Sequence, residues 1–278
     1  MKIIISEGSG FCFGVKRAIQ AAFDTADREK SGVFTLGPII HNPQVVSRLE
    51  GLGVRVLDNA DATDDVRVLI IRSHGVGPDV YESVSGRGIR VIDATCPFVK
   101  TAQSHAETLS REGYQVIIVG DRAHPEVQGI LGYAGQDAVV FGKDDHADRF
   151  SIKRKVGIIS QTTQSFNTLQ RVIEEVLPLA GELRIFNTIC NATRKRQYET
   201  GKLAESVDVM VVVGGKNSAN TRRLQNLCEA QGVSAYHIET AQELQPEWFN
   251  DAQTVGITGG ASTPDWIIQE VAEHLREL

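Results

Sequence analysis

The sequence predicts an α/β protein built from three similar domains, each with four mostly parallel strands, arranged in a pseudo-threefold ring. Three observations support this prediction. Twelve short runs rich in β-branched residues alternate with helical patterns, three cysteines divide the chain into similar lengths, and the strands divide evenly among those lengths. Strands that alternate with helices favour parallel sheets, because a helix carries the chain back to the edge where the next parallel strand begins.

The predicted strands are 3–5, 33–36, 54–57, 68–71, 89–92, 116–119, 139–141, 156–159, 183–186, 209–213, 236–238 and 255–258. Helices are predicted directly after Cys12 and Cys96, where apolar residues recur at the spacing of one helix face. These apolar positions are Val15, Ala18, Ile19, Ala22 and Ala26 in the first helix and Val99, Ala102, Ala106 and Leu109 in the second.

The domain boundaries follow from Cys12, Cys96 and Cys190, each of which lies between a predicted strand and a helical or charged segment. Residues 12–95 and 96–189 each contain four predicted strands, whereas residues 190–278 contain three and need the N-terminal strand as a fourth. We therefore predict domains at 13–96, 97–190 and 191–278, the last completed by 1–12. The alternative is a single large doubly wound sheet with unrelated thiols.

Composition restricts the classes of partner. The chain has 278 residues, of which 41% are hydrophobic and 23% charged, with a formal net charge of −6. This composition is typical of a globular protein and does not suggest nucleic-acid binding, so we expect small-molecule or protein partners. The apolar run after Lys2 is too short for a signal peptide, and no apolar stretch is long enough to cross a membrane, so we expect a cytoplasmic protein.

The cysteines predict a metal centre. A reducing compartment disfavours disulfides, and no CxxC pair typical of structural zinc is present. In DATCPFV, Pro97 predicts a helix start that places Cys96 at the N-cap, where a thiolate is stabilised. A cubane iron–sulfur cluster normally has four thiolate ligands, so three would leave one iron open. Cys228 lies among leucines in a helical segment and is predicted to be a core thiol.

Polar side chains follow the other predicted strands. They are His41, His74, His124, Glu126, Gln161, Thr162, Thr163, Asn217, Ser218, Asn220, Ser262 and Thr263. Ligands bind beyond the carboxyl ends of parallel strands, and helix N-termini there attract phosphate. Taken singly, Ser218, Ser262 and Thr162 are also typical helix caps, and a histidine in a loop is often only hydrogen-bonded. The repetition of such groups at strand ends favours an anion site.

The motifs GFCFGVKRA, DATCPFV, AHPEVQG, SQTT, NTICNAT, KNSANTRRL and GGAST, in this order, resemble the LytB family of 4-hydroxy-3-methylbut-2-enyl diphosphate reductases. The resemblance covers essentially the whole chain. It implies three α/β lobes around a central [4Fe-4S] cluster with one open iron, held by Cys12, Cys96 and Cys190. It also implies an allylic diphosphate substrate that is reductively dehydroxylated to isopentenyl and dimethylallyl diphosphate, the last step of the non-mevalonate pathway.

The resemblance implies roles for individual residues. Glu126 would be the proton source, with Thr162 as a relay and His124 beside them. The residues implied to bind the diphosphate are His41, His74, His124, Thr162, Ser218, Ala219, Asn220 and Ser262. Ala219 stands where some family members have a second serine, so a contact there must come from the backbone.

Other interpretations of the same residues stay open. Cys96 activated by His124 would be a nucleophile of a hydrolase or transferase, and a non-catalytic metal carrier would also use the cysteines. The resemblance implies ferredoxin or flavodoxin as electron donor. The basic run Arg194–Lys195–Arg196 is a candidate docking face for such a donor, although a solvated helix turn is the commoner meaning of such a run.

Overall fold

The structure is a computed structural model that describes residues 1–29, 31–59 and 65–278. The chain separates into two compact units. Unit 1 comprises residues 1–16, 41–44 and 191–278, and unit 2 comprises residues 17–40 and 45–190. In the described residues, no helix has both the length and the apolar character needed to cross a membrane.

In the residues that the structure describes, twelve strands form three sheets of four strands, and every pairing is parallel. The sheet of unit 1 has the order β1-β12-β10-β11, and the sheets of unit 2 have the orders β3-β2-β4-β5 and β7-β6-β8-β9. The strands are β1 (Lys2–Ile5), β2 (Val33–Leu36), β3 (Arg55–Leu57), β4 (Val68–Ile71), β5 (Arg90–Asp93), β6 (Gln115–Val119), β7 (Val139–Phe141), β8 (Lys155–Ser160), β9 (Glu182–Ile185), β10 (Val209–Val213), β11 (Ser234–Ile238) and β12 (Thr254–Gly259).

Helices connect the strands, as parallel pairing requires. They are α1 (Phe13–Arg28), α2 (Pro43–Glu50), α3 (Pro78–Val84), α4 (Pro97–Arg111), α5 (Pro125–Leu131), α6 (Phe166–Val176), α7 (Asn191–Ala204), α8 (Ala219–Ala230) and α9 (Asp265–Glu277). Three short 3-10 helices complete the described elements: η1 (Ala147–Arg149), η2 (Ala241–Glu243) and η3 (Pro246–Phe249).

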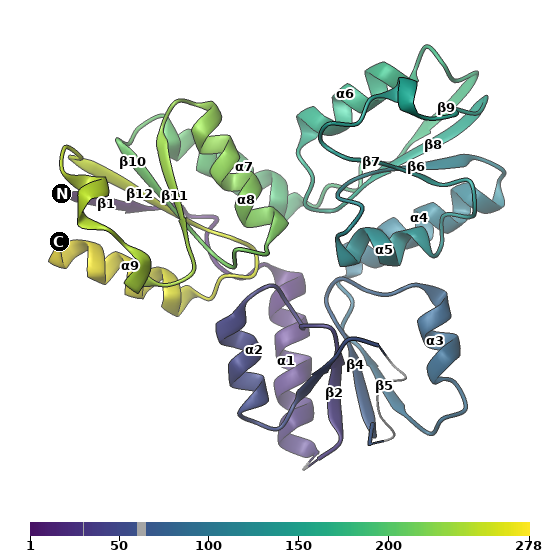
Figure 1. The fold of residues 1–278 in the computed structure, drawn as a ribbon, viewed down its shortest axis with the longest axis horizontal. Coiled ribbons are helices and arrows are strands. Elements are labelled where there is room, and N and C mark those ends of the chain that lie inside the picture. Colours follow the sequence, from purple (N-terminus) through teal and green to yellow (C-terminus); the bar gives the residue numbers. More distant parts are fainter. Residues whose placement is uncertain (30, 60–64) are drawn as a thin grey trace. The chain divides into compact units, whose positions relative to one another are not determined.

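The sheet of unit 1 is covered by helices on both faces. Side chains alternate along β10, so Val211 packs with Ile268 of α9, whereas Met210 packs with Leu224 of α8. Figure 1 shows α9 on one side of this sheet and α7 and α8 on the other. Burial on both faces explains why β10 is a continuous apolar run, VMVVV, rather than an alternating one.

The same layering recurs in the β6–β9 sheet of unit 2. Ile118 of β6 lies in one core cluster with Leu109 of α4, and Ile117 lies in another with Val172 of α6. Gly157 of β8 faces Leu109 so closely that an added Cβ would lie 2.5 Å from the leucine Cδ2. A larger residue at position 157 would therefore displace the buried Leu109 side chain of α4.

The prediction of an α/β protein with three four-stranded parallel sheets is confirmed, and each predicted strand overlaps an observed one. The N-terminal strand does complete the sheet of the C-terminal segment, because β1 pairs with β12. A single large doubly wound sheet is excluded within the described residues. The domain boundaries at 12/13, 96/97 and 190/191, and the ring arrangement, stay predictions.

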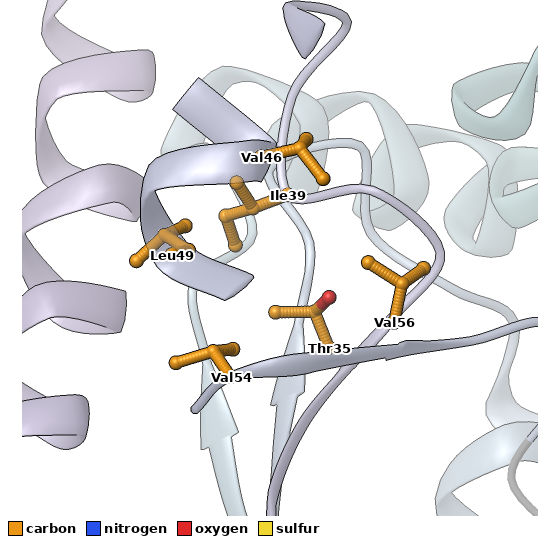
Figure 2. A pocket seen from close by; sticks show the side chains of 6 residues that line it. All are labelled: Thr35, Ile39, Val46, Leu49, Val54 and Val56. Atoms are coloured by element: carbon orange, nitrogen blue, oxygen red, sulfur yellow. The ribbon is translucent and has the colours of Figure 1, made fainter. Parts of the chain in front are cut away.

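A small pocket lies beside α2, and none of the predicted site residues lines it (Figure 2). Five of its six lining residues are apolar, and the sixth is Thr35 of β2. The residues that line it are Thr35, Ile39, Val46, Leu49, Val54 and Val56. An apolar space with one hydroxyl offers no set of convergent polar groups for a substrate.

Candidate active site

Three cysteines each stand immediately before a helix. Cys12 precedes α1, Cys96 precedes α4 and Cys190 precedes α7. Each also follows the carboxyl end of a strand, since β1, β5 and β9 end shortly before them. Cys96 is the N-cap residue of α4, and Pro97 is the first helical residue, as the sequence predicted. The start of a helix, where backbone N–H groups have no partner within the helix, therefore lies beside each cysteine.

The fourth cysteine is different in kind. Cys228 lies inside α8 with no exposed surface, in the core cluster that also contains Met210 and Leu224. Burial raises the pKa of its thiol to about 12. The other three cysteines are partly exposed, and none of the four forms a disulfide. The prediction that Cys228 is a core thiol is confirmed.

This difference gives a first test. Alkylation of the full-length protein with iodoacetamide at pH 8 should leave Cys228 unmodified, because a thiol with a pKa of about 12 is almost entirely protonated there. Peptide mass spectrometry of native and urea-unfolded samples measures the difference, with the unfolded sample as control. Rapid modification of Cys228 in the native protein would contradict its placement in the core.

Glu126 and Thr162 form a buried pair in unit 2. Glu126 is 2% exposed, and its Oε1 accepts a hydrogen bond of 2.6 Å from the Thr162 backbone N–H. Its Oε2 accepts a second bond, of 3.0 Å, from the Thr162 hydroxyl. The carboxyl is thus fixed in one orientation and joined to a hydroxyl, which is the arrangement that proton transfer between two groups requires.

The strand order brings these two residues together. Glu126 lies in the first turn of α5, after β6, and Thr162 follows β8, which pairs with β6. Gly120 allows the close approach: a Cβ at this position would lie 2.8 Å from Val127 and 3.0 Å from Gln161. A glycine at the end of β6 is therefore needed for α5 to pack against the loop after β8.

Two histidines lie beside the buried pair. His124 is the N-cap of α5 and its Nδ1 accepts a 3.1 Å hydrogen bond from the Glu126 backbone N–H. Because the His124 Nδ1 accepts this bond, the proton of the neutral imidazole is on Nε2. The rings of His74 and His124 meet edge to face, with centroids 5.3 Å apart and planes at 83°. Four of the predicted site residues thus form one cluster in unit 2.

Cys190 is linked to the same cluster through the backbone. Its N–H donates to the Thr162 carbonyl oxygen at 3.0 Å. The loop before Cys190 is held by Thr188, whose hydroxyl donates to the Ser160 carbonyl oxygen at 2.5 Å and accepts from the Ser160 N–H at 2.8 Å. The Cys96 N–H in turn donates to the Ser73 carbonyl oxygen, next to His74. Ser160 and Thr188 lie within the motifs SQTT and NTICNAT, but the motifs alone indicate no role for them, because their contact across two strand ends leaves no local signal.

Unit 1 holds a second group of predicted residues. Ser218 caps α8 by accepting a hydrogen bond from the Thr221 N–H. Asn220 is 6% exposed, and neither atom of its side-chain amide has a hydrogen-bond partner in the described part of the chain. The Ser262 hydroxyl donates to the His41 carbonyl oxygen at 3.2 Å. An unpartnered buried amide is costly, so the Asn220 amide is available to hydrogen-bond a polar ligand.

Tight backbone contacts position this second group. A Cβ at Gly215 would lie 2.6 Å from the His41 carbonyl oxygen, so only glycine fits there. The Cys12 N–H donates to the Ala261 carbonyl oxygen at 3.2 Å, which ties the cysteine to the loop that carries Ser262. Cys12, His41, Ser218, Asn220 and Ser262 therefore belong to one unit, with Ala219 as the first residue of α8.

Two details differ from the sequence interpretation. Of the three hydroxyl residues considered as helix caps, only Ser218 is one, because the caps of α6 and α9 are Ser165 and Pro264.

The residues of the basic run on α7 also differ in their exposure. Arg194 and Lys195 are exposed, whereas Arg196 is 4% exposed and donates to backbone carbonyls, so it cannot belong to a docking face.

Comparison with known proteins identifies the family of this chain. The family model described as LytB protein matches residues 3–276. A 4-hydroxy-3-methylbut-2-enyl diphosphate reductase of Geobacter sulfurreducens is 53% identical over 278 residues, covering 100% of this chain and 98% of the relative. The same-named protein of Pelobacter propionicus is 50% identical, with coverage of 100% and 99%.

Two solved structures are similar to this chain in fold and sequence. One, described as the structure of (E)-4-hydroxy-3-methyl-but-2-enyl diphosphate reductase, the terminal enzyme of the non-mevalonate pathway, is 45% identical with full coverage of both chains and a TM-score of 0.71. A reductase structure from Plasmodium falciparum is 25% identical, covers 98% of this chain and 87% of its own, and has a TM-score of 0.92. With a family match over nearly its whole length and full-length relatives that are reductases, the chain is an oxidoreductase and belongs to the LytB protein family.

Proposed function

We propose that the protein reduces (E)-4-hydroxy-3-methylbut-2-enyl diphosphate to isopentenyl diphosphate and dimethylallyl diphosphate. The observation that carries the proposal is the 53% identity, over the full chain, to a relative named for this substrate. The reaction breaks the allylic C–O bond and forms a C–H bond. Two electrons and two protons are consumed, and the hydroxyl group leaves as water.

Cys12, Cys96 and Cys190 would hold a [4Fe-4S] cluster with one open iron. These three cysteines suit an iron–sulfur cluster, because their partly exposed thiols stand at helix starts. The remaining cysteine, Cys228, is buried, and burial raises the pKa of its thiol to about 12. Three thiolates suit a four-iron cluster that keeps one iron accessible, and do not complete the four ligands of structural zinc. When bound, the cluster would supply electrons and a Lewis acid for the departing hydroxyl group.

The polar residues at the strand ends would bind the diphosphate. In unit 1, Ser218 and Asn220 stand at the start of α8, where N–H groups and the helix dipole favour an anion. Ala219 would contribute only its backbone, and Ser262 would add a hydroxyl. In unit 2, His74, His124 and Thr162 would bind the same group, and His41 would complete the set. The unsatisfied amide of Asn220 supports this assignment.

Loss of the Asn220 amide should weaken substrate binding. We expect Asn220→Ala to raise KM for the diphosphate about tenfold or more, because a hydrogen bond to a charged group contributes about 1.5–3 kcal/mol. Asn226→Ala, on the exposed side of the same helix, is the matched control and should keep the native KM. Steady-state kinetics with a chemical reductant measures both. Equal KM values for the two variants would remove Asn220 from the binding site.

Glu126 would supply the proton that the leaving hydroxyl group needs. Hydroxide is a poor leaving group, so protonation at the moment of C–O cleavage lowers the barrier. The Thr162 hydroxyl, which is hydrogen-bonded to the Glu126 carboxyl at 3.0 Å, would pass the proton toward the substrate. His124, which accepts from the Glu126 N–H, would orient this pair while it binds the diphosphate.

The electron donor would be a ferredoxin or flavodoxin, and the protein would act in the cytoplasm. Arg194 and Lys195 are the candidate contact for an acidic donor, because they are exposed whereas Arg196 is buried. Arg194→Glu with Lys195→Glu should lower turnover with flavodoxin several-fold and leave viologen-driven turnover unchanged. Identical rates with the protein donor before and after charge reversal would exclude this surface.

Anaerobic turnover of the allylic diphosphate with reduced methyl viologen tests the proposed function. We expect both C5 diphosphates as products, detected by mass spectrometry after quenching. Hydrolysis of the substrate without viologen oxidation would instead favour a cysteine nucleophile, with Cys96 as the attacking thiolate. Iron-containing protein with no turnover of any kind would favour a metal carrier.

A further inference from the structure

Arg196 binds the loop that leads into Cys12. It lies on α7, and its Nε donates to the Gly8 carbonyl oxygen at 2.9 Å while its Nη2 donates to the Gly10 carbonyl oxygen at 2.6 Å. These residues are distant in the sequence but belong to the same unit. One planar guanidinium therefore fixes two carbonyls of the loop in a single orientation.

The burial of Arg196 makes this interaction specific. The side chain is 4% exposed, and its Nε and Nη2 groups donate to the two loop carbonyls, which offsets part of the cost of burying the charge. The loop has no side chains at the two contact points, and Gly10 has φ +97°, a conformation that favours glycine. A Cβ at Gly8 would overlap Glu199, and one at Gly10 would overlap Asp265. The fit leaves the loop little room to move.

Other contacts hold the opposite side of the same loop. The Ser9 hydroxyl accepts a 3.1 Å hydrogen bond from the Gly259 N–H, and the Cys12 N–H donates to the Ala261 carbonyl oxygen. The loop is thus held between α7 and the end of β12. Without the Arg196 guanidinium, only the β12 side would remain fixed.

A second arginine makes the same kind of contact in unit 2. Arg17, on α1, donates from Nη1 to the Thr95 carbonyl oxygen at 2.7 Å and from Nη2 to the Asp93 carbonyl oxygen at 3.3 Å. Thr95 immediately precedes Cys96. In both cases an arginine on the helix after one cysteine binds two backbone carbonyls that lie shortly before a different cysteine.

We propose that Arg196 and Arg17 are positioning residues that hold the thiols of Cys12 and Cys96 in the geometry for binding the cluster. The inference rests on the proposed cluster. The two arginines would act on the cluster ligands indirectly, by binding the backbone that precedes each cysteine. Removing either guanidinium frees two carbonyls, so the adjacent thiol samples more orientations and binds iron less firmly. Groups that orient ligands in this way affect metal affinity about 10–100-fold.

The first experiment measures iron release from anaerobically purified full-length protein to a ferrous chelator. Arg196→Gln and Arg17→Gln should each speed release about 10–100-fold relative to the native protein. Lys202→Gln on α7 and Arg28→Gln on α1, both at exposed positions, are the matched controls and should leave the rate unchanged. Arg196→Lys keeps the charge without the two-pronged geometry and should fall between the native protein and Arg196→Gln.

The second experiment measures the alkylation rate of each cysteine in the iron-stripped full chain. Arg196→Gln should raise the rate at Cys12 several-fold relative to Cys96 and Cys190, and Arg17→Gln should raise it selectively at Cys96. A general loss of stability would instead accelerate all three thiols together. This comparison also works if the native protein holds no iron, so it separates failure of the positioning role from failure of the proposed function.

Equal acceleration of all three thiols, or unchanged thiol and iron-release rates in both variants, would overturn the proposal. Arg196→Gln removes a buried group, so thermal unfolding by circular dichroism accompanies each measurement. Arg17 is exposed, and its replacement leaves no buried charge unpaired. If Arg196→Gln does not fold, selective acceleration at Cys96 in Arg17→Gln supports the proposal, and its absence rejects it.

Discussion

Replacing Glu126 by Gln should abolish most turnover while leaving the fold and the iron content intact. The amide oxygen of Gln can still accept the Thr162 N–H, and its NH2 can donate to the Thr162 hydroxyl oxygen, so the two contacts survive. Only the transferable proton is lost. Loss of a general acid lowers kcat about 10²–10⁴-fold, and steady-state viologen oxidation measures it.

Two controls make this result specific. Glu174→Gln, an exposed carboxylate on α6, should keep native kcat. Thr162→Ser retains the hydroxyl and should stay near native activity, whereas Thr162→Val keeps the volume, loses the hydroxyl and should lower kcat in the same direction as Glu126→Gln. Native turnover in Glu126→Gln would exclude Glu126 as the proton source.

Replacing any one of Cys12, Cys96 and Cys190 by Ser should remove iron and reduce turnover to background. Serine preserves the size of the side chain, but an alkoxide ligand forms far less readily at neutral pH than a thiolate, so the proposed cluster would lose one of its three protein ligands. Iron per chain after anaerobic purification and viologen-driven turnover are the two measurements. Loss should be similar at all three positions, because the proposed cluster needs each of them.

Cys228→Ala is the matched control for the cysteine series. Its thiol is fully buried in the core and has a raised pKa, so iron content and turnover should stay native. The substitution should cost some stability, about 1 kcal/mol, because a small buried group is removed. An iron deficit in Cys228→Ala equal to that in the other three variants would contradict the distinction between the core thiol and the proposed ligands.

The strands and the cysteine positions were predictable because local patterns determine them. A short run of β-branched residues is typical of a buried parallel strand, and a proline such as Pro97 is typical of the first residue of a helix. The sheet orders carry no such local signal. In the sheet β7-β6-β8-β9, for example, β7 is an edge strand, and β8 pairs with β6 and not with β7, which precedes it in the chain.

The candidate site was predictable as a set of residues and not as a set of contacts. The Glu126–Thr162 pair depends on the adjacency of β6 and β8 and on the small size of Gly120, which no pattern around either residue reveals. Arg196 was misread for the same reason. A charged residue in a basic run is normally solvated, and its carbonyl partners lie at the other end of the chain.

The meeting of Cys12, Cys96 and Cys190 at one cluster is the central claim, and the iron and sulfide content of anaerobically purified native protein tests it most directly. A [4Fe-4S] cluster predicts about four irons and about four sulfides per chain, with a brown colour that fades in air. Colourless protein that contains no iron and still reduces the allylic diphosphate would contradict it.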